Sequence, residues 1–132
     1  MRIQAYLRIL GDENTIRAIE RETGVTNARI LQTKARRTSL SEEVWWNWET
    51  ARVSVDAENP DEDVKALLLA HRQSFPIFKK HSGVADIYLE LVTQYEEGEE
   101  PTGIFLSAET VQLLSEMGAA MDNDVVVMAK KA

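Results

Sequence analysis

Cysteine is missing from this 132-residue chain, and histidine and proline are scarce, with two and three residues. Without cysteine there is no disulfide framework, no thiolate nucleophile and no cysteine-ligated zinc or iron–sulfur cluster. This composition suits a reducing compartment, so we expect a cytoplasmic protein. His71 and His81 have no carboxylate at the spacing of a helical metal site. We therefore predict no bound metal and no cofactor.

Long apolar runs and catalytic motifs are also missing. No segment approaches the roughly 18 apolar residues that cross a bilayer, and Arg2 and Arg8 interrupt the N-terminal segment, so we expect no signal peptide. The six glycines form no phosphate-binding loop, and Ser107 lies outside any nucleophile elbow. Residues 122–124 lack the glycine of a calcium loop and are predicted to be a turn. We expect no membrane association, and we favour a non-enzymatic function over catalysis.

Basic charge is in deficit. Fifteen Lys and Arg against twenty-two Asp and Glu give a net charge of −7, which disfavours nucleic acid and favours a basic protein as partner. Residues 1–52 carry a net +2 and residues 53–132 a net −9. The densest acidic group is Glu96, Glu97, Glu99 and Glu100. These glutamates form either a solvated loop tip or a partner-binding surface that steers association, and both roles stay open.

Two arginines and three tryptophans are further candidates for binding. Arg36 and Arg37, in a predicted loop over 34–39, are candidates for an anion or ligand site. Trp46 and Trp48 share one side of a predicted strand, whereas Trp45 faces the other side. We expect two buried indoles and one exposed indole, which would anchor a partner or form the wall of a pocket.

The spacing of apolar residues predicts the first strands and helices. Strands are expected over 3–9, 28–34, 44–55 and 85–93. Within the third of these the apolar face changes parity, which indicates a bulge near Glu49 or Thr50. One helix is expected from an N-cap at Asn14 to Gly24, and a second from Asn59 and Pro60 to an interruption at Pro76.

The last third of the chain is predicted to contain a hairpin, a helix and a strand. The acidic loop over 95–102 would lead to a return strand over 103–106. Ser107 would cap a helix that buries Val111, Leu114 and Met117 and ends at Gly118. Residues 125–128 are apolar on both parities, which is typical of a central strand.

The predicted order is β-α-β-β-α-β followed by β-α-β. The first six elements match the ferredoxin-like, split βαβ connection pattern. We therefore predict a single α+β domain over 1–132, with a mostly antiparallel sheet and the helices on one face.

Four segments give the chain a family resemblance: Tyr6–Asp12, Ile19–Gly24, Val44–Thr50 and Ile104–Ala108 running on to Gly118. In order and spacing they resemble the bacterial family called domain of unknown function 4279. The chain has Asn27 where that family tends to have proline, and it ends in 124–127 without the family's tyrosine. The resemblance implies no catalytic residues, and it implies an analogy to small acidic immunity or antitoxin-type proteins that cover a toxin.

Two functional hypotheses follow from the sequence. The first is a non-enzymatic acidic binding domain that covers a basic partner through the four glutamates and an exposed tryptophan. The alternative is a small-ligand sensor or minor enzyme with a pocket lined by tryptophan and by Arg36 and Arg37. The protein would be a monomer, or a homodimer formed along an exposed strand edge.

Overall fold

The computed structural model describes residues 1–33, 36–37, 42–100 and 103–129. In chain order the elements are β1 (Arg2–Gly11), α1 (Glu13–Thr23), β2 (Arg29–Gln32), β3 (Arg36–Arg37), β4 (Glu42–Glu43), β5 (Trp46–Glu49), β6 (Val53–Val55), α2 (Pro60–Ala70), the 3₁₀ helix η1 (Arg72–Ser74), α3 (Phe75–His81), β7 (Asp86–Glu96), α4 (Ala108–Met117) and β8 (Ala120–Met128).

The main sheet has the strand order β2-β5-β1-β7-β8, with β6 also paired to β1. Its pairings are antiparallel except for β8, which runs parallel to β7. β5 separates the two strands of the β1-α1-β2 unit, and β1 separates the two strands of the β6-α2-β7 unit. This interleaving confirms the predicted split βαβ arrangement and the α+β class.

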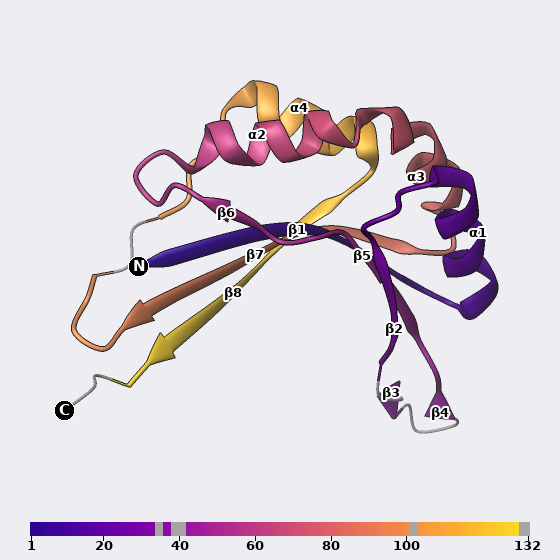
Figure 1. The fold of residues 1–132 in the computed structure, drawn as a ribbon, viewed down its shortest axis with the longest axis horizontal. Helices are drawn as coiled ribbons and strands as arrows, with labels where there is room; N and C mark the ends of the chain where they lie inside the picture. The colour runs from indigo at the N-terminus through magenta and orange to yellow at the C-terminus, as the bar shows by residue number, and fades with distance from the viewer. Residues whose placement is uncertain (34–35, 38–41, 101–102, 130–132) are drawn as a thin grey trace.

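The four α-helices lie along one face of this sheet (Figure 1). They bury the odd-numbered side chains of β1. These apolar residues alternate with mostly polar residues at even-numbered positions, so the strand is amphipathic as expected. Apolar side chains from every layer meet in one core cluster, including Leu7, Ile16, Trp48, Leu68, Phe78, Leu89 and Met117. Among the described residues, none of the helices is long and apolar enough to cross a membrane.

The predicted bulge lies between β5 and β6. Arg8 pairs with Glu49 and Ala5 pairs with Val53, so three steps along β1 correspond to four steps along the facing chain. One extra residue is therefore inserted, which is the definition of a bulge. Thr50 fills the gap, because its backbone N–H donates to the Leu7 carbonyl and its Oγ1 accepts from the Leu7 N–H.

The helix ends differ from the predictions in detail. Asp12, not Asn14, is the N-cap of α1, because its Oδ1 accepts a hydrogen bond from the Thr15 N–H at 2.8 Å. The αL conformation of Gly24 ends α1 as predicted. Pro60 begins α2, but the helix breaks at η1, a few residues before Pro76.

The predicted return strand over 103–106 is wrong. Those residues have no regular secondary structure, and they lead to the helical layer, where the Ser107 N–H donates to Asp61 Oδ1 at 2.8 Å. Ile104 and Leu106 pack partly buried against the core, so their alternation reflects a connection and not a strand pair. The position beside β7 is taken by β8, in parallel.

The predicted central position of 125–128 is also wrong. These residues belong to β8, which ends the sheet order of the described strands, and their side chains are exposed. The predicted turn at 122–124 lies within the same strand. Apolar residues on both parities therefore do not identify a central strand here, because this strand lies at the edge and exposes them on both faces. Val111 is likewise exposed, and Leu113 takes its predicted place on the buried face of α4.

Candidate functional site

The sheet face opposite the helices carries a row of opposite charges across neighbouring strands. Arg29 of β2 pairs in register with Glu49 of β5, which pairs with Arg8 of β1. Arg29 Nη2 lies 3.1 Å from Glu49 Oε2, and the Glu49 carboxylate is largely buried. Even-numbered positions of β1 point to this side, so the strand alternation that builds the core also places these charges on the open face.

The row continues through Arg8 into the last two strands. Arg8 Nη2 lies 2.6 Å from Glu90 Oε1 on β7 and 4.0 Å from Asp122 Oδ2 on β8. Glu90 and Asp122 are register partners, so their carboxyl groups meet side by side. We call Arg8, Arg29, Glu49, Glu90 and Asp122 the open-face network.

Glu90 is the least ordinary member of this network. The residue is only 1% exposed, and its Oε2 is buried with no hydrogen-bond partner. Burial raises the pKa of the Glu90 carboxyl to about 7; Arg8 opposes this shift and the neighbouring Asp122 adds to it. A buried carboxylate that keeps an unpaired oxygen costs stability, and such costs are concentrated at functional sites.

Two tyrosines lie between the charges. The Arg8 guanidinium carbon sits 4.8 Å from the centre of the Tyr88 ring, and that of Arg52 sits 4.7 Å from the centre of the Tyr6 ring. Burial raises the pKa of the Tyr6 phenol, Glu49 and Glu90 raise it further, and Arg52 and Arg8 lower it. The arginines therefore pack over aromatic rings, which holds them on this face.

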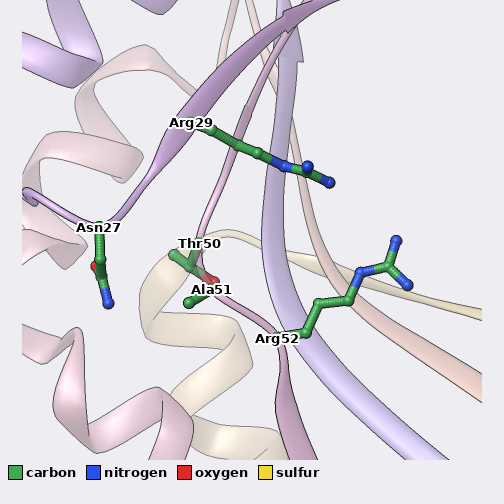
Figure 2. Close-up of a pocket in the computed structure, with 5 residues that line it drawn as sticks. All are labelled: Asn27, Arg29, Thr50, Ala51 and Arg52. Carbon is green, nitrogen blue, oxygen red and sulfur yellow. The ribbon is translucent and has the colours of Figure 1, made fainter.

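A cleft of about 400 Å³ opens beside the bulge, at the β2 side of the network. Figure 2 shows its lining residues, Asn27, Arg29, Thr50, Ala51 and Arg52. Arg29 and Arg52 extend toward the same side of the strands in that view, one from β2 and the other from the segment between β5 and β6. Two guanidinium groups at one cleft favour an anionic ligand, although Glu49 already neutralises one of them.

Three carboxylates at the other end of the face lie close enough to share a cation. Ligand oxygens of Glu90, Asp122 and Asp124 are within 4.8 Å of one another. Oxygen ligands of this kind suit calcium or magnesium. Arg8 already supplies one positive charge to the group.

The three tryptophans occupy buried or half-buried positions, so the expected exposed indole is wrong. Trp48 is fully buried in the core, with its ring centre 5.6 Å from that of Phe78, and it offers no surface to a partner. Trp46 is half-buried, and the Arg17 guanidinium carbon lies 5.4 Å from its ring centre. Trp45 is half-buried too and lines a separate cleft with Asp12, Val44 and Val84. The cleft at Trp45 contains no arginine among its lining residues, and the cleft at Arg29 and Arg52 contains no tryptophan.

The four predicted glutamates lie together at the end of β7, and all are exposed. The Glu97 N–H donates to the carbonyl of Met128, so this acidic turn adjoins the end of β8. Glu99 binds the N-terminal amine of Met1 at 2.9 Å, and Arg2 lines the same shallow cleft. The backbone of Arg36 and Arg37 forms β3, which pairs with β4, so the predicted loop is wrong at these two positions. Their side chains lie outside the described residues.

The histidines serve the packing of helices. His81 Nε2 lies 2.7 Å from Glu22 Oε2, which joins α3 to α1, and hydrogen bonds from Lys80 and His81 lower the pKa of the Glu22 carboxyl to about 2. His71 is half-buried, and burial lowers the pKa of its imidazole. Neither histidine faces the open-face network.

The open-face network was not predicted from the sequence. Arg8, Arg29 and Glu90 each stand between two apolar residues of the chain, a pattern that indicates an ordinary solvated face. Arg8, Glu49 and Glu90 are distant in sequence, and only the strand order brings them into contact. A usable signal would have been the presence of both charge signs at the polar positions of several predicted strands.

This combination defines a small α+β protein whose split βαβ sheet has one helix-covered face and one charged open face. The chain belongs to the family described as domain of unknown function (DUF4279), whose model matches residues 1–128. The predicted family is thereby confirmed. No curated protein matches the chain, and no solved structure does.

Proposed function

We propose that this protein is a non-enzymatic, protein-binding domain of immunity or antitoxin type, which covers a basic partner with the β8 side of its sheet. The observation that carries the proposal is the composition of that side. β8 exposes five large apolar side chains, which are Met121, Val125 and Val127 on the helix side and Val126 and Met128 on the open face. Apolar side chains that are exposed along a strand edge and bordered by polar groups are typical of a protein interface.

The border of this surface is acidic. Asp122 and Asp124 lie on β8 itself, and the four exposed glutamates of the acidic turn lie beside its end. The N-terminal amine and Arg2 offset part of this charge. The remaining negative charge favours a partner with a basic surface and accelerates its association.

The test is a comparison of two charge-matched variants. The full chain is used to capture its partner from the native host, the partner is identified by mass spectrometry and purified, and association rates are measured over a range of salt concentrations. One variant carries Gln at Glu96, Glu97, Glu99 and Glu100. The control carries Gln at four exposed glutamates on the helix side, Glu13, Glu58, Glu62 and Glu116.

We expect the acidic-turn variant to associate about tenfold more slowly at low salt, with a flatter salt dependence, and the control to match the wild type. Equal association rates for the two variants, or a partner without a basic surface, would refute the proposal.

The arginine cleft supports a second candidate function, the binding of a small anionic ligand. Arg29 and Arg52 both line the cleft, and Arg52 has a ring contact but no carboxylate partner among the described residues. A panel of carboxylates and phosphates would be screened for a rise in melting temperature. A rise that disappears in Arg52→Gln would support ligand binding, and a panel without any such rise would dismiss it.

A further inference from the structure

We propose that the partner docks by adding a strand to the free edge of β8, and that cationic side chains at alternate positions of this strand reach Asp122 and Asp124. This inference rests on the proposed function and specifies how the partner binds. It follows from the backbone, the side-chain pattern and the charge of one edge.

The backbone of β8 offers a template for pairing. Nine residues pair in parallel with β7, from Ala120 opposite Tyr88 to Met128 opposite Glu96, and no other described strand pairs with β8. At an edge, every second residue directs its N–H and C=O groups away from the sheet. Proteins usually protect such edges with proline, charged side chains or a bulge. The segment 120–128 contains no proline, and its register with β7 is continuous. Its two charges, Asp122 and Asp124, repel an acidic strand but attract a basic one.

The two sides of β8 differ in chemistry. Asp122 and Asp124 pair with Glu90 and Val92 and so lie on the open face. Val125 and Val127 lie on the helix side, where they are 53% and 55% exposed because the helices do not reach them. A strand laid against residues 121–125 would meet carboxylates on the open face and apolar side chains on the helix side, whereas Val126 and Met128 make the end of the open face apolar. A segment that alternates basic and apolar residues fits the first part of this edge.

The two aspartates of β8 favour a further positive charge. Asp122 and Asp124 add two carboxylates beside Glu90, and Arg8, the cationic side chain that contacts this group in the described structure, is already paired with Glu90 at 2.6 Å. Neighbouring strands lie about 4.8 Å apart, so a lysine or arginine opposite Asp122 or Asp124 can extend over the open face to their oxygens.

A second copy of this chain fits the same edge poorly. If two β8 strands paired antiparallel about their central residue, Asp124 would face Asp124 of the other copy. Like charges opposite one another destabilise a strand pair, and each chain has a net charge of −7. Charge therefore favours a basic strand over self-association.

The experiment uses the full chain and three fluorescent ten-residue peptides. The first alternates lysine and valine, the second has the same composition in two blocks, and the third is the first with N-methyl groups on every second residue of one edge. Binding is followed by anisotropy, and amide hydrogen exchange reports which strand is covered. The chain is tested as wild type, as Asp122→Asn with Asp124→Asn, and as the control Glu13→Gln with Glu116→Gln.

We expect the alternating peptide to bind most tightly and to slow exchange at β8 amides. Its affinity should fall about tenfold with either the block peptide, the N-methylated peptide or the double aspartate variant, and stay unchanged in the control. Both aspartates are exposed or half-buried on an edge strand, so the substitutions leave the core intact.

Other outcomes would overturn the inference in distinguishable ways. Equal binding of the alternating and block peptides would show attraction by charge without strand addition, and would leave the proposed function standing. If calcium ions bind with a dissociation constant in the micromolar range and prevent peptide binding, the carboxylates are a metal site. Sedimentation that shows a dimer paired through β8 would make the edge a self-association surface. Absence of peptide binding, with native partner binding still dependent on the acidic turn, would move docking away from β8.

Discussion

Leu89 and Glu90 are neighbours on β7, and both are almost completely buried, but on opposite faces of the sheet. Leu89 contacts the apolar core beneath the helices, where burial is favourable. Glu90 is buried among polar side chains, and one of its oxygens has no hydrogen bond. The covered face is therefore built for stability, whereas the open face retains a group that reduces it. This difference identifies the open face as the place to look for function.

The largest expected effect is on the free energy of unfolding, when side chains on the two faces of β7 are each replaced by alanine. Leu89→Ala should lower the free energy of unfolding by about 2–5 kcal/mol, because it leaves a cavity in the core. Tyr88→Ala, on the open face, should cost about 1 kcal/mol, mainly through its contact with Arg8. Urea unfolding of both variants measures the difference. Equal losses would show that the open face contributes to the core.

The next effect concerns pH. Because the pKa of Glu90 is about 7 in the folded protein and ordinarily 4.5, the folded state holds this proton more tightly. The unfolding free energy therefore falls as pH rises from about 5 to 8. In Glu90→Gln this fall should shrink by roughly 2 kcal/mol. Urea unfolding at several pH values tests it, with exposed Glu96→Gln as control. A profile parallel to the wild type would assign the pH dependence to another group.

A smaller effect is expected where the helices are fixed over the covered face. Ser107→Ala should cost about 1 kcal/mol, because Ser107 Oγ accepts a hydrogen bond from the Thr110 N–H at the start of α4. Asn59→Ala should change stability by only a few tenths of a kcal/mol, because Asn59 makes no side-chain cap bond to α2. Thermal unfolding of the pair provides the comparison. A larger loss of stability in Asn59→Ala than in Ser107→Ala would mean that the observed hydrogen bond does not account for the strength of the helix cap.

The smallest effect on stability is expected at the acidic turn. The four exposed glutamates at 96, 97, 99 and 100 lie at or beyond the end of β7, so their replacement by glutamine should leave the urea midpoint unchanged. The same variant should still associate with the partner more slowly than the wild type does. A large shift of the midpoint would mean that the contact between Glu99 and the N-terminal amine holds β1 and β7 together.

Much of the fold was predictable because local patterns agree with the tertiary structure. The alternation around Leu7, the Pro60 helix start and the parity change at Thr50 all reflect constraints within a few residues. Sequence reasoning failed where a local pattern has two causes. Ile104 and Leu106 alternate like a strand but line a connection, and Val125–Met128 resembles a buried strand but lies at the edge.

The candidate site was predictable only in part. The acidic turn follows directly from four neighbouring glutamates, whereas the open-face network requires residues from β1, β5 and β7 to meet. Exposure of the tryptophans was decided by how far the helices extend over β5. Trp48 lies beneath the helices against Phe78. The alternation of residues along the strand does not show how far the helices cover it.

By itself, the sequence determined most of the helices and the long strands, the split βαβ order and the surplus of negative charge. These properties depend on local periodicity, end signals and composition, which are complete in the one-dimensional chain. Only the tertiary structure decided that β8 lies at an edge and that Glu90 is buried beside Arg8 on the uncovered face. The order of the strands and the extent to which helices cover each of them depend on contacts between residues far apart in the chain. Such contacts produce no periodic pattern in the sequence.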